Sequence, residues 1–435
     1  MVFMPVLAST GSTDVNFGSR IKEFRLENGL KVILIKDKRT DNVISSIWYK
    51  VGSSYETSGI TGISHLLEHM MFKATKSTKS GEFSAEIKKI GGSENAFTGR
   101  DFTGYYQKID KQYLLMCLKY EADRMSNLQF NLDELKSERE VVKEERRLRT
   151  EDQPFSIVFE KIGLGILGMT GYGIPIIGTM DDLTNINISD LDYWYKRFYN
   201  PSNATLIIAG NFDEIETIEA VKNFFGPIGT IESNLNKYKY PQFDISYEKI
   251  VVNERLPNPT LILSFIKPKF ADLPRKKAYA IDLLFEILDG SFSSRFTANI
   301  VDKKIALNTF IYHDLYAKEK NIISIGGTPR ENVTLKQLEE SLLYEINSII
   351  KNGLGDNELS DTKSRIISKN IYRFDSIFTQ AMIVGRLEAK NISWEILDSY
   401  IKDIDSIEDE DIIEAAEYIM SKSIQVTVVQ PKNEN

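Results

Sequence analysis

Apolar and polar residues alternate near the start of the chain in a pattern that predicts paired strands. The stretch KEFRLENGLKVILIKD (22–37) alternates on both sides of Asn28-Gly29, a pair typical of a type I′ hairpin turn. The apolar run VISSIWYKV (43–51) follows and predicts a buried strand. We therefore expect a β-sheet to begin in this region.

Further along, apolar residues recur with the period of a helix, and strand-like runs separate these stretches. Helices are predicted at residues 62–73, 82–90, 112–126 and 132–150, and strands at 95–99, 103–109 and 203–212. Gly91-Gly92 ends the second of these helices, because glycine accepts the left-handed conformation that terminates many helices.

The plan of the first half recurs in the second. PTLILSFIKPKF (259–270) predicts a strand, and KKAYAIDLLFEILDG (276–290) predicts an apolar helix after it. The halves also end alike, because residues 188–210 and 407–430 both predict a helix followed by a strand. We interpret the chain as two homologous α+β domains, each a mostly antiparallel sheet packed with helices.

The length of 435 residues exceeds what one ordinary hydrophobic core spans, in agreement with two domains. We place the first domain at residues 20–227 and the second at residues 246–432. Residues 228–245 between them are polar with few core positions, as in a linker. Apolar residues make up 42% of the chain and charged residues 27%, which is typical of a globular protein.

Charge and cysteine content exclude some classes of protein. The net charge of −8 and the pI of about 5.3 give no basic footprint, so we expect no nucleic-acid partner. The sequence has no run of 18 or more apolar residues, so we expect no membrane-spanning helix. Cys117 is the single cysteine and has no partner for an internal disulfide.

The first ten residues, MVFMPVLAST, are apolar and end in small residues, like the tail of a signal peptide. They lack the basic residues that normally begin such a peptide. We expect an exported, periplasmic protein, and a cytoplasmic location is the alternative.

Two of the three histidines lie four residues apart in GISHLLEHMMF (62–72). On the predicted helix, His65 and His69 share one face and can converge on a metal ion. Zinc suits two imidazoles with a carboxylate beside them. Glu68 borders the same face, where it can act as a general base on water at the metal. Alternatively, these are ordinary helix histidines, because short HxxEH strings recur by chance.

A catalytic zinc takes three protein ligands and leaves one position open. His313 lies far away in the second half, and Cys117 lies in an apolar helix where an inert buried thiol is expected. We therefore expect the third ligand to be a carboxylate.

The charged segment LDELKSEREVVKEERRLRTED (132–152) is where we expect that carboxylate. On a helix, two sets of its residues form an inward side: Leu135, Val142 and Arg149, spaced by seven, and the apolar pair Val141 and Leu148. This periodicity directs Glu138 and Glu145 inward, and it encloses Glu145 among apolar neighbours. Buried carboxylates are normally paired or metal-bound, although a glutamate in such a segment can also be a solvated surface residue.

HLLEH, followed by Glu145 76 positions after His69 within EREVVKEE, resembles the inverzincin metallopeptidases of the pitrilysin or insulinase family. The stretches NGLKVILIKD, GGSENAFTGRDFTGYY (91–106) and residues 172–213 are similar to segments of that family as well. The resemblance covers most of residues 20–215, and the duplicated plan and the length extend it to the remainder. It implies a LuxS/processing-peptidase-like fold for both domains.

The resemblance also implies roles for individual residues. His65, His69 and Glu145 would bind one zinc ion per chain, and Glu68 would be the general base. Glu138, seven residues before Glu145, matches a second glutamate of the family and would help catalysis by orienting the site from behind the ligands.

The length matches the two-domain bacterial and processing-peptidase-like members, in which two chains face each other and enclose a chamber. The resemblance therefore implies a zinc metalloendopeptidase that hydrolyses unfolded peptides or protein segments inside a closed chamber. The strand at Asn95, Ala96 and Phe97 would pair with the substrate backbone as an added strand. The alternative for Asn95 is a polar residue that closes a turn.

The sequence departs from the family in its second half. Active members carry an arginine and a tyrosine, seven residues apart, in the half opposite the zinc, where they hold substrate and stabilise the oxyanion. Aligned from Ser294-Arg295, these positions are Val301 and Asn308 here. We therefore expect a heterodimer with a homologous subunit that supplies the arginine and tyrosine. A self-sufficient homodimer and a non-catalytic or structural subunit of the same fold are the alternatives.

Overall fold

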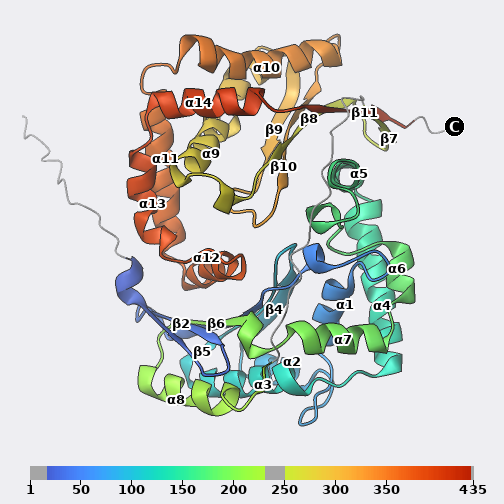
Figure 1. Cartoon of the computed structure of the whole chain (residues 1–435), viewed down its shortest axis with the longest axis vertical. Helices are drawn as coiled ribbons and strands as arrows, with labels where there is room; N and C mark the ends of the chain where they lie inside the picture. Colours follow the sequence, from blue (N-terminus) through green and yellow to red (C-terminus); the bar gives the residue numbers. More distant parts are fainter. Residues whose placement is uncertain (1–16, 231–249, 433–435) are drawn as a thin grey trace, which may run out of the picture.

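The computed structural model describes residues 17–230 and 250–432 as two halves, each built on one β-sheet (Figure 1). The amino-terminal stretch MVFMPVLAST and nearly all of the predicted linker lie outside these residues. The location of the protein and its domain boundaries therefore stay predictions. None of the helices in the described ranges is long and apolar enough to cross a bilayer.

The first sheet has six strands in the order β1-β2-β6-β3-β5-β4. Its strands are β1 (Ile21–Arg25), β2 (Lys31–Lys36), β3 (Asn42–Tyr49), β4 (Ser93–Thr98), β5 (Thr103–Asp110) and β6 (Ala204–Gly210). All neighbouring pairs are antiparallel except β2 and β6. Strand β4 forms one edge of the sheet, with β5 as its neighbour in the strand order.

The second sheet has five strands in the order β7-β11-β8-β10-β9. Its strands are β7 (Ile250–Glu254), β8 (Thr260–Lys267), β9 (Ala306–Tyr312), β10 (Asn321–Pro329) and β11 (Gln425–Pro431). The pair of β7 and β11 is parallel, and the other pairs are antiparallel. Two mostly antiparallel sheets, each packed with helices, confirm the predicted α+β fold class.

Helices from the same half cover one face of each sheet. In the first half these are α1 (Ile63–Met70), α2 (Glu82–Lys89), α3 (Leu114–Asn127), α4 (Leu132–Arg146), α7 (Ile188–Phe198) and α8 (Glu214–Phe225), with the short α6 (Met180–Asn185) beside α4. In the second half they are α9 (Arg275–Asp289), α10 (Leu335–Asn352), α11 (Glu358–Arg373), α13 (Ile396–Asp405) and α14 (Asp409–Met420). The alternation of side chains along each strand then leaves a second apolar face on both sheets.

The halves exchange one helix each to cover these second faces (Figure 1). Helix α12 (Ile377–Ala389) belongs to the second half but packs on β3 and β6 of the first sheet, where Trp48 is fully buried. Helix α5 (Pro154–Leu167) belongs to the first half, and its apolar residues share a core with strands β7, β8 and β11. Each half therefore completes the apolar packing of the other.

Buried polar contacts reinforce this exchange. The Lys31 ammonium on β2 lies 2.8 Å from the Glu388 carboxylate on α12, and both residues are buried. Glu388 also accepts a hydrogen bond from the backbone of Trp394. On the opposite side, Tyr172 accepts the backbone N–H of Lys318, which comes from the second half. A buried ion pair is costly to break on one side only, so these contacts fix how the halves dock.

The predicted elements agree closely with the observed ones, with one correction. The hairpin around Asn28-Gly29 is present, but β1 ends at Arg25 and β2 begins at Lys31, so the predicted two-residue type I′ turn is wrong. Instead, the Asn28 side chain donates hydrogen bonds to the carbonyls of Phe225 and Ile228. These bonds tie the connection to the end of α8, and the turn itself is closed by backbone bonds from Leu26 to Leu30 and from Gly29 to Leu26.

Helix α12 approaches the sheet so closely that we expect Gly385→Ala to destabilise the protein. A Cβ atom at this position would overlap the Trp48 indole. Overpacking of this kind costs about 1–3 kcal/mol in the free energy of unfolding, which urea denaturation followed by circular dichroism measures.

Gly163→Ala in the exchanged helix α5 is the matched control, because a Cβ atom there has no neighbour within 4 Å. It should leave the free energy unchanged or raise it by up to about 1 kcal/mol through better helix propensity. Equal effects of the two substitutions would contradict the close packing of α12.

Candidate metal centre

Helix α1 carries the histidine pair because its two faces differ. The apolar face packs into the core of the first half through Ile63, Leu66, Leu67 and Met70. His65, Glu68 and His69 share the remaining face, since residues three and four apart lie together on a helix. The centres of the two imidazole rings are 4.9 Å apart.

Two carboxylates anchor the start of this helix. Gly62 has φ of 89° at the first turn, and a Cβ atom there would overlap the Ile177 carbonyl. The Glu56 carboxylate accepts the backbone N–H groups of Gly62 at 2.6 Å and of Ser64 at 2.9 Å. Asp182 on α6 accepts the N–H of Thr61 at 3.0 Å. These contacts satisfy free N–H groups at the helix start and fix where His65 points.

Glu145 on helix α4 faces both histidines. Its carboxylate oxygens lie 3.6 Å from Nε2 of His65 and 3.4 Å from Nε2 of His69. One ligand atom from each of the three residues lies within 4.8 Å of the other two. Ligands of a tetrahedral zinc, at about 2.0–2.2 Å from the metal, lie roughly 3.4 Å from each other, so the set fits one zinc ion.

The protonation of His65 and Glu145 suits a metal, whereas at His69 a metal would have to displace a proton. Burial, followed by the nearness of His69, lowers the pKa of His65 to about 4, so its imidazole is neutral at pH 7 and offers a lone pair. Burial opposes the charged form of His69, but Glu145 and Glu138 outweigh it and raise that pKa. The pKa of Glu145 is lowered, chiefly by His69, which keeps the carboxylate charged.

Glu138 lies behind His69 rather than among the three converging residues. Its carboxylate is 3.1 Å from Nδ1 of His69 and 2.6 Å from the Lys73 ammonium. A carboxylate on Nδ1 fixes the ring and turns Nε2 towards Glu145. The structure thus places Glu138 beside His69 and outside the three converging residues, and its role in catalysis stays a prediction.

Glu68 is buried beside the histidines, and burial raises its pKa to about 7. The Thr98 hydroxyl on β4 donates a hydrogen bond to its carboxylate. A carboxylate with a pKa near neutral can accept and release a proton at pH 7. The sequence reasoning missed Thr98. It could have been found from its position, because Thr98 lies two residues after Ala96 on the predicted substrate strand, and residues two apart on a strand share a face.

The expected substrate strand, with Asn95, Ala96 and Phe97, lies at the edge of the first sheet. Asn95 is exposed, and its side chain accepts the N–H of Ala96. Ala96 faces the helices, whereas Phe97 turns to the other face and packs edge-on against Trp48 at 5.0 Å. The backbone of β4 therefore offers the free edge, and Phe97 contributes to the packing of the halves.

The predicted inward side of α4 is partly wrong. Leu135 and Val142 are buried, but Val141 and Leu148 are 47% and 57% exposed. Arg149 is exposed as well, and it pairs with Glu145 at 2.7 Å. The α-helical period ends at Arg146 and the π-helical turn η4 (Arg147–Glu151) follows, so the heptad spacing does not hold for Leu148 and Arg149. Val141 lies within α4, on its outward side.

The second half has no counterpart of this centre among its described residues. Val301 ends the π-helical turn η8 (Thr297–Val301), and Asn308 is exposed on the edge strand β9. His313 lies 3.2 Å from Asp282 of α9 and is not among the three converging residues.

Comparison with protein families gives two matches that together span most of the chain. The family described as insulinase (peptidase family M16) matches residues 31–180, which include His65, Glu68, His69 and Glu145. The family described as peptidase M16 inactive domain matches residues 185–366.

Individual relatives are named as proteases. The zinc protease PqqE of Helicobacter pylori is 30% identical over 344 residues, which cover 78% of this chain and 76% of that protein. The uncharacterized zinc protease YmxG of Bacillus subtilis is 27% identical over 94% of this chain and 98% of its own length. The crystal structure of a protease from Helicobacter pylori superposes with a TM-score of 0.83 at 25% identity, over 94% of this chain and 99% of that one. The first two relatives are named zinc proteases, and His65, His69 and Glu145 form a possible site for zinc in this chain.

We expect Glu138→Gln to weaken zinc binding by about 10–100-fold, because the neutral amide fixes His69 less firmly and no longer pairs with Lys73. Competition with a coloured chelator measures the zinc Kd. Glu140→Gln, on the exposed side of the same helix, is the matched control and should change the Kd less than twofold. An unchanged Kd for Glu138→Gln would show that the contact with His69 does not support the metal.

Proposed function

Because the chain belongs to the insulinase (M16) peptidase family, we propose that it is a zinc-dependent metalloendopeptidase with one zinc per chain. The observation that carries the proposal is the convergence of His65, His69 and Glu145, with the buried Glu68 beside them. In this proposal the three converging residues hold the metal and Glu68 is the general base.

The roles of the protein groups follow from their positions. When bound, zinc would polarise the scissile carbonyl and acidify the attacking water. Glu68 takes the proton of that water as it attacks, and its pKa near 7 lets it pass the proton to the leaving amine. Thr98 holds the Glu68 carboxylate in place from β4, and Glu138 keeps the His69 ring oriented.

The proposed substrates are unfolded peptides or protein segments. An extended peptide can add to the free edge of β4 through backbone hydrogen bonds, which do not depend on its sequence. Because Thr98 lies on the same strand, a peptide bound at this edge lies next to Glu68. Folded proteins do not offer a free strand of this kind, so we propose that the site selects unfolded segments.

We further propose that the chain is the zinc-bearing subunit of a heterodimer whose two chains enclose the site in a closed chamber. The support is the pair of positions Val301 and Asn308, whose side chains cannot replace an arginine and a tyrosine at an oxyanion. A homologous partner would supply both groups.

Two other functions remain distinct alternatives. A self-sufficient homodimer would cleave peptides without a second kind of subunit. A non-catalytic or structural subunit of the same fold would cleave none, with or without a partner. The complete set of His65, Glu68, His69 and Glu145 favours an active enzyme over the second alternative.

For the catalytic role of Glu68, we expect Glu68→Gln to lower the rate of peptide cleavage by about 10²–10⁴-fold while one zinc per chain is retained. The amide has nearly the same shape but accepts no proton. A quenched unfolded peptide reports the rate, and atomic absorption reports the zinc. Loss of zinc together with activity would instead assign Glu68 to metal binding, and full activity would contradict the proposed mechanism.

For the missing partner, we expect the isolated, zinc-loaded chain to cleave the peptide slowly, and the double variant Val301→Arg, Asn308→Tyr to cleave it faster. Oxyanion donors typically contribute about 10²–10³ in kcat, which sets the upper limit of the gain. Val301→Met, Asn308→Phe is the matched control, because both side chains are long or large but carry no hydrogen-bond donor. Robust turnover by the unmodified chain, abolished by Glu68→Gln, would establish the self-sufficient homodimer instead.

A further inference from the structure

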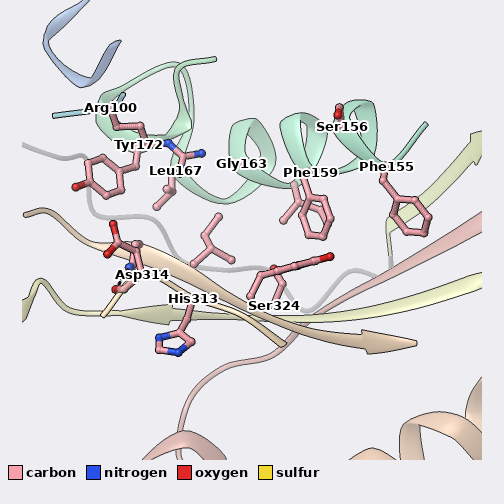
Figure 2. A pocket seen from close by; sticks show the side chains of 14 residues that line it. Arg100, Phe155, Ser156, Phe159, Gly163, Leu167, Tyr172, His313, Asp314 and Ser324 are labelled. Carbon is pink, nitrogen blue, oxygen red and sulfur yellow. Dashed lines mark hydrogen bonds between the residues drawn. The ribbon is translucent and has the colours of Figure 1, made fainter. Parts of the chain in front are cut away.

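A pocket of about 560 Å³ lies where helix α5 of the first half faces the second sheet (Figure 2). Phe155, Phe159 and Leu167 of α5 form one wall. Tyr312 of β9 and Ser324 of β10 lie across from them. The pocket therefore exists only because the halves exchange helices.

The lining is mainly aromatic at one end. The rings of Phe159 and Tyr312 meet edge-on at 5.3 Å, and Phe310 stacks on Tyr312 at 5.0 Å. Phe155 and Tyr312 remain 40% and 57% exposed, although both are large apolar groups. An aromatic ligand can extend such a cluster, because rings favour edge-on and offset contacts with one another.

The other end of the pocket is polar but carries no unpaired acid. Asp314 lies 2.6 Å from the Lys390 ammonium, which balances its charge. The Arg100 guanidinium lies over the Tyr172 ring at 5.4 Å and can donate to a peptide carbonyl. His313 turns its ring away from α5, towards Phe285 on the far side of the sheet (Figure 2). This end suits peptide backbone, and the aromatic end suits an uncharged side chain.

Gly163 marks open space inside the pocket. This residue lines the pocket in the middle of α5 and is itself buried, yet a Cβ atom built on it would have no neighbour within 4 Å. Protein interiors are normally close-packed, so a buried glycine that faces free space borders a real cavity.

Two parts of the pocket lining follow residues of the metal centre along the chain. Arg100 follows Thr98 by two residues, and Thr98 contacts Glu68. Helix α5 follows α4 and η4, which carry Glu145 and Arg149. A peptide on the edge of β4 that continues past Thr98 therefore reaches Arg100 and the pocket behind it.

We propose that this pocket binds a bulky aromatic side chain of the peptide substrate, at a position away from the scissile bond. The proposal rests on the peptidase function proposed above and adds a substrate class to it, namely peptides that carry a tryptophan or another large aromatic residue. The aromatic ring inserts beside Phe159 and Tyr312, and Arg100 contacts the adjoining backbone.

Peptide binding to the full-length Glu68→Gln protein loaded with zinc tests the proposal. The probes are fluorescein-labelled ten-residue peptides of glycine, serine and alanine, with one tryptophan placed at each position in turn. The reference peptides carry alanine at that position. Fluorescence anisotropy gives the Kd of each. We expect the best tryptophan peptide to bind about tenfold more tightly than its alanine counterpart. The added ring buries apolar area and contacts the aromatic cluster, which accounts for a gain of this size.

Substitutions in the pocket assign this preference to it. Gly163→Leu fills the free space and should reduce the tryptophan advantage to less than twofold. Gly165→Leu is the matched control, because Gly165 lies on the exposed side of the same helix, and it should keep the advantage. Tyr312→Ala removes an exposed ring from the opposite wall and should also reduce the tryptophan advantage. It is the deciding variant if circular dichroism shows that Gly163→Leu does not fold.

The proposal is overturned if tryptophan and alanine peptides bind equally, or if the advantage survives both Gly163→Leu and Tyr312→Ala. The same titrations on the metal-free natural chain measure peptide binding independently of catalysis, so they separate the pocket from the proposed peptidase function. A tryptophan preference there without any cleavage by the zinc-loaded chain would refute the peptidase function but keep the pocket. Cleavage without the preference would refute the pocket alone.

Discussion

The structure depends on the docking of two helices, α1 and α4, at a distance that lets two imidazoles meet one carboxylate. Neither helix can form the centre alone, because α1 carries His65 and His69 whereas α4 carries Glu145. Burial disfavours charge at all of these positions. At His69 and Glu145 the opposite charges and hydrogen bonds within the group outweigh that cost, whereas His65 stays neutral at pH 7. The apolar core under α1 and the carboxylate of Glu56 at its start hold this geometry in place.

The two halves share the same plan of a sheet covered by helices, but they differ in what they contribute to the site. The first half holds the metal centre, and the second half supplies α12, which supports the back of the sheet that presents β4. In return, α5 leaves the region of the metal centre and packs on the second sheet. The two halves are thereby joined by two shared apolar cores, each built from segments far apart in the chain.

Much of this was predictable from the sequence, where local signals are strong. The helix with HLLEH and the repeated helix–strand endings of the halves follow from periodicity. The approach of Glu145 to the histidines was predicted from the inward side of α4 together with the family resemblance. The exposure of Leu148 and Arg149 could not be predicted, because the helix type changes after Arg146 and alters which side chains face inward. Val141 lies before this change, on the outward side of α4, where the heptad reading placed it wrongly. The exchange of α5 and α12 was also missed, since an apolar helix does not indicate which of two distant sheets it will cover.

The central claim is that His65, His69 and Glu145 together hold one zinc ion. A crystal structure of the zinc-loaded chain, with anomalous diffraction recorded on both sides of the zinc absorption edge, tests it most directly. The account predicts one strong zinc peak per chain, at about 2.0–2.2 Å from Nε2 of both histidines and from a Glu145 oxygen. A zinc peak at other residues, or none at this position in protein shown to contain zinc, would contradict it.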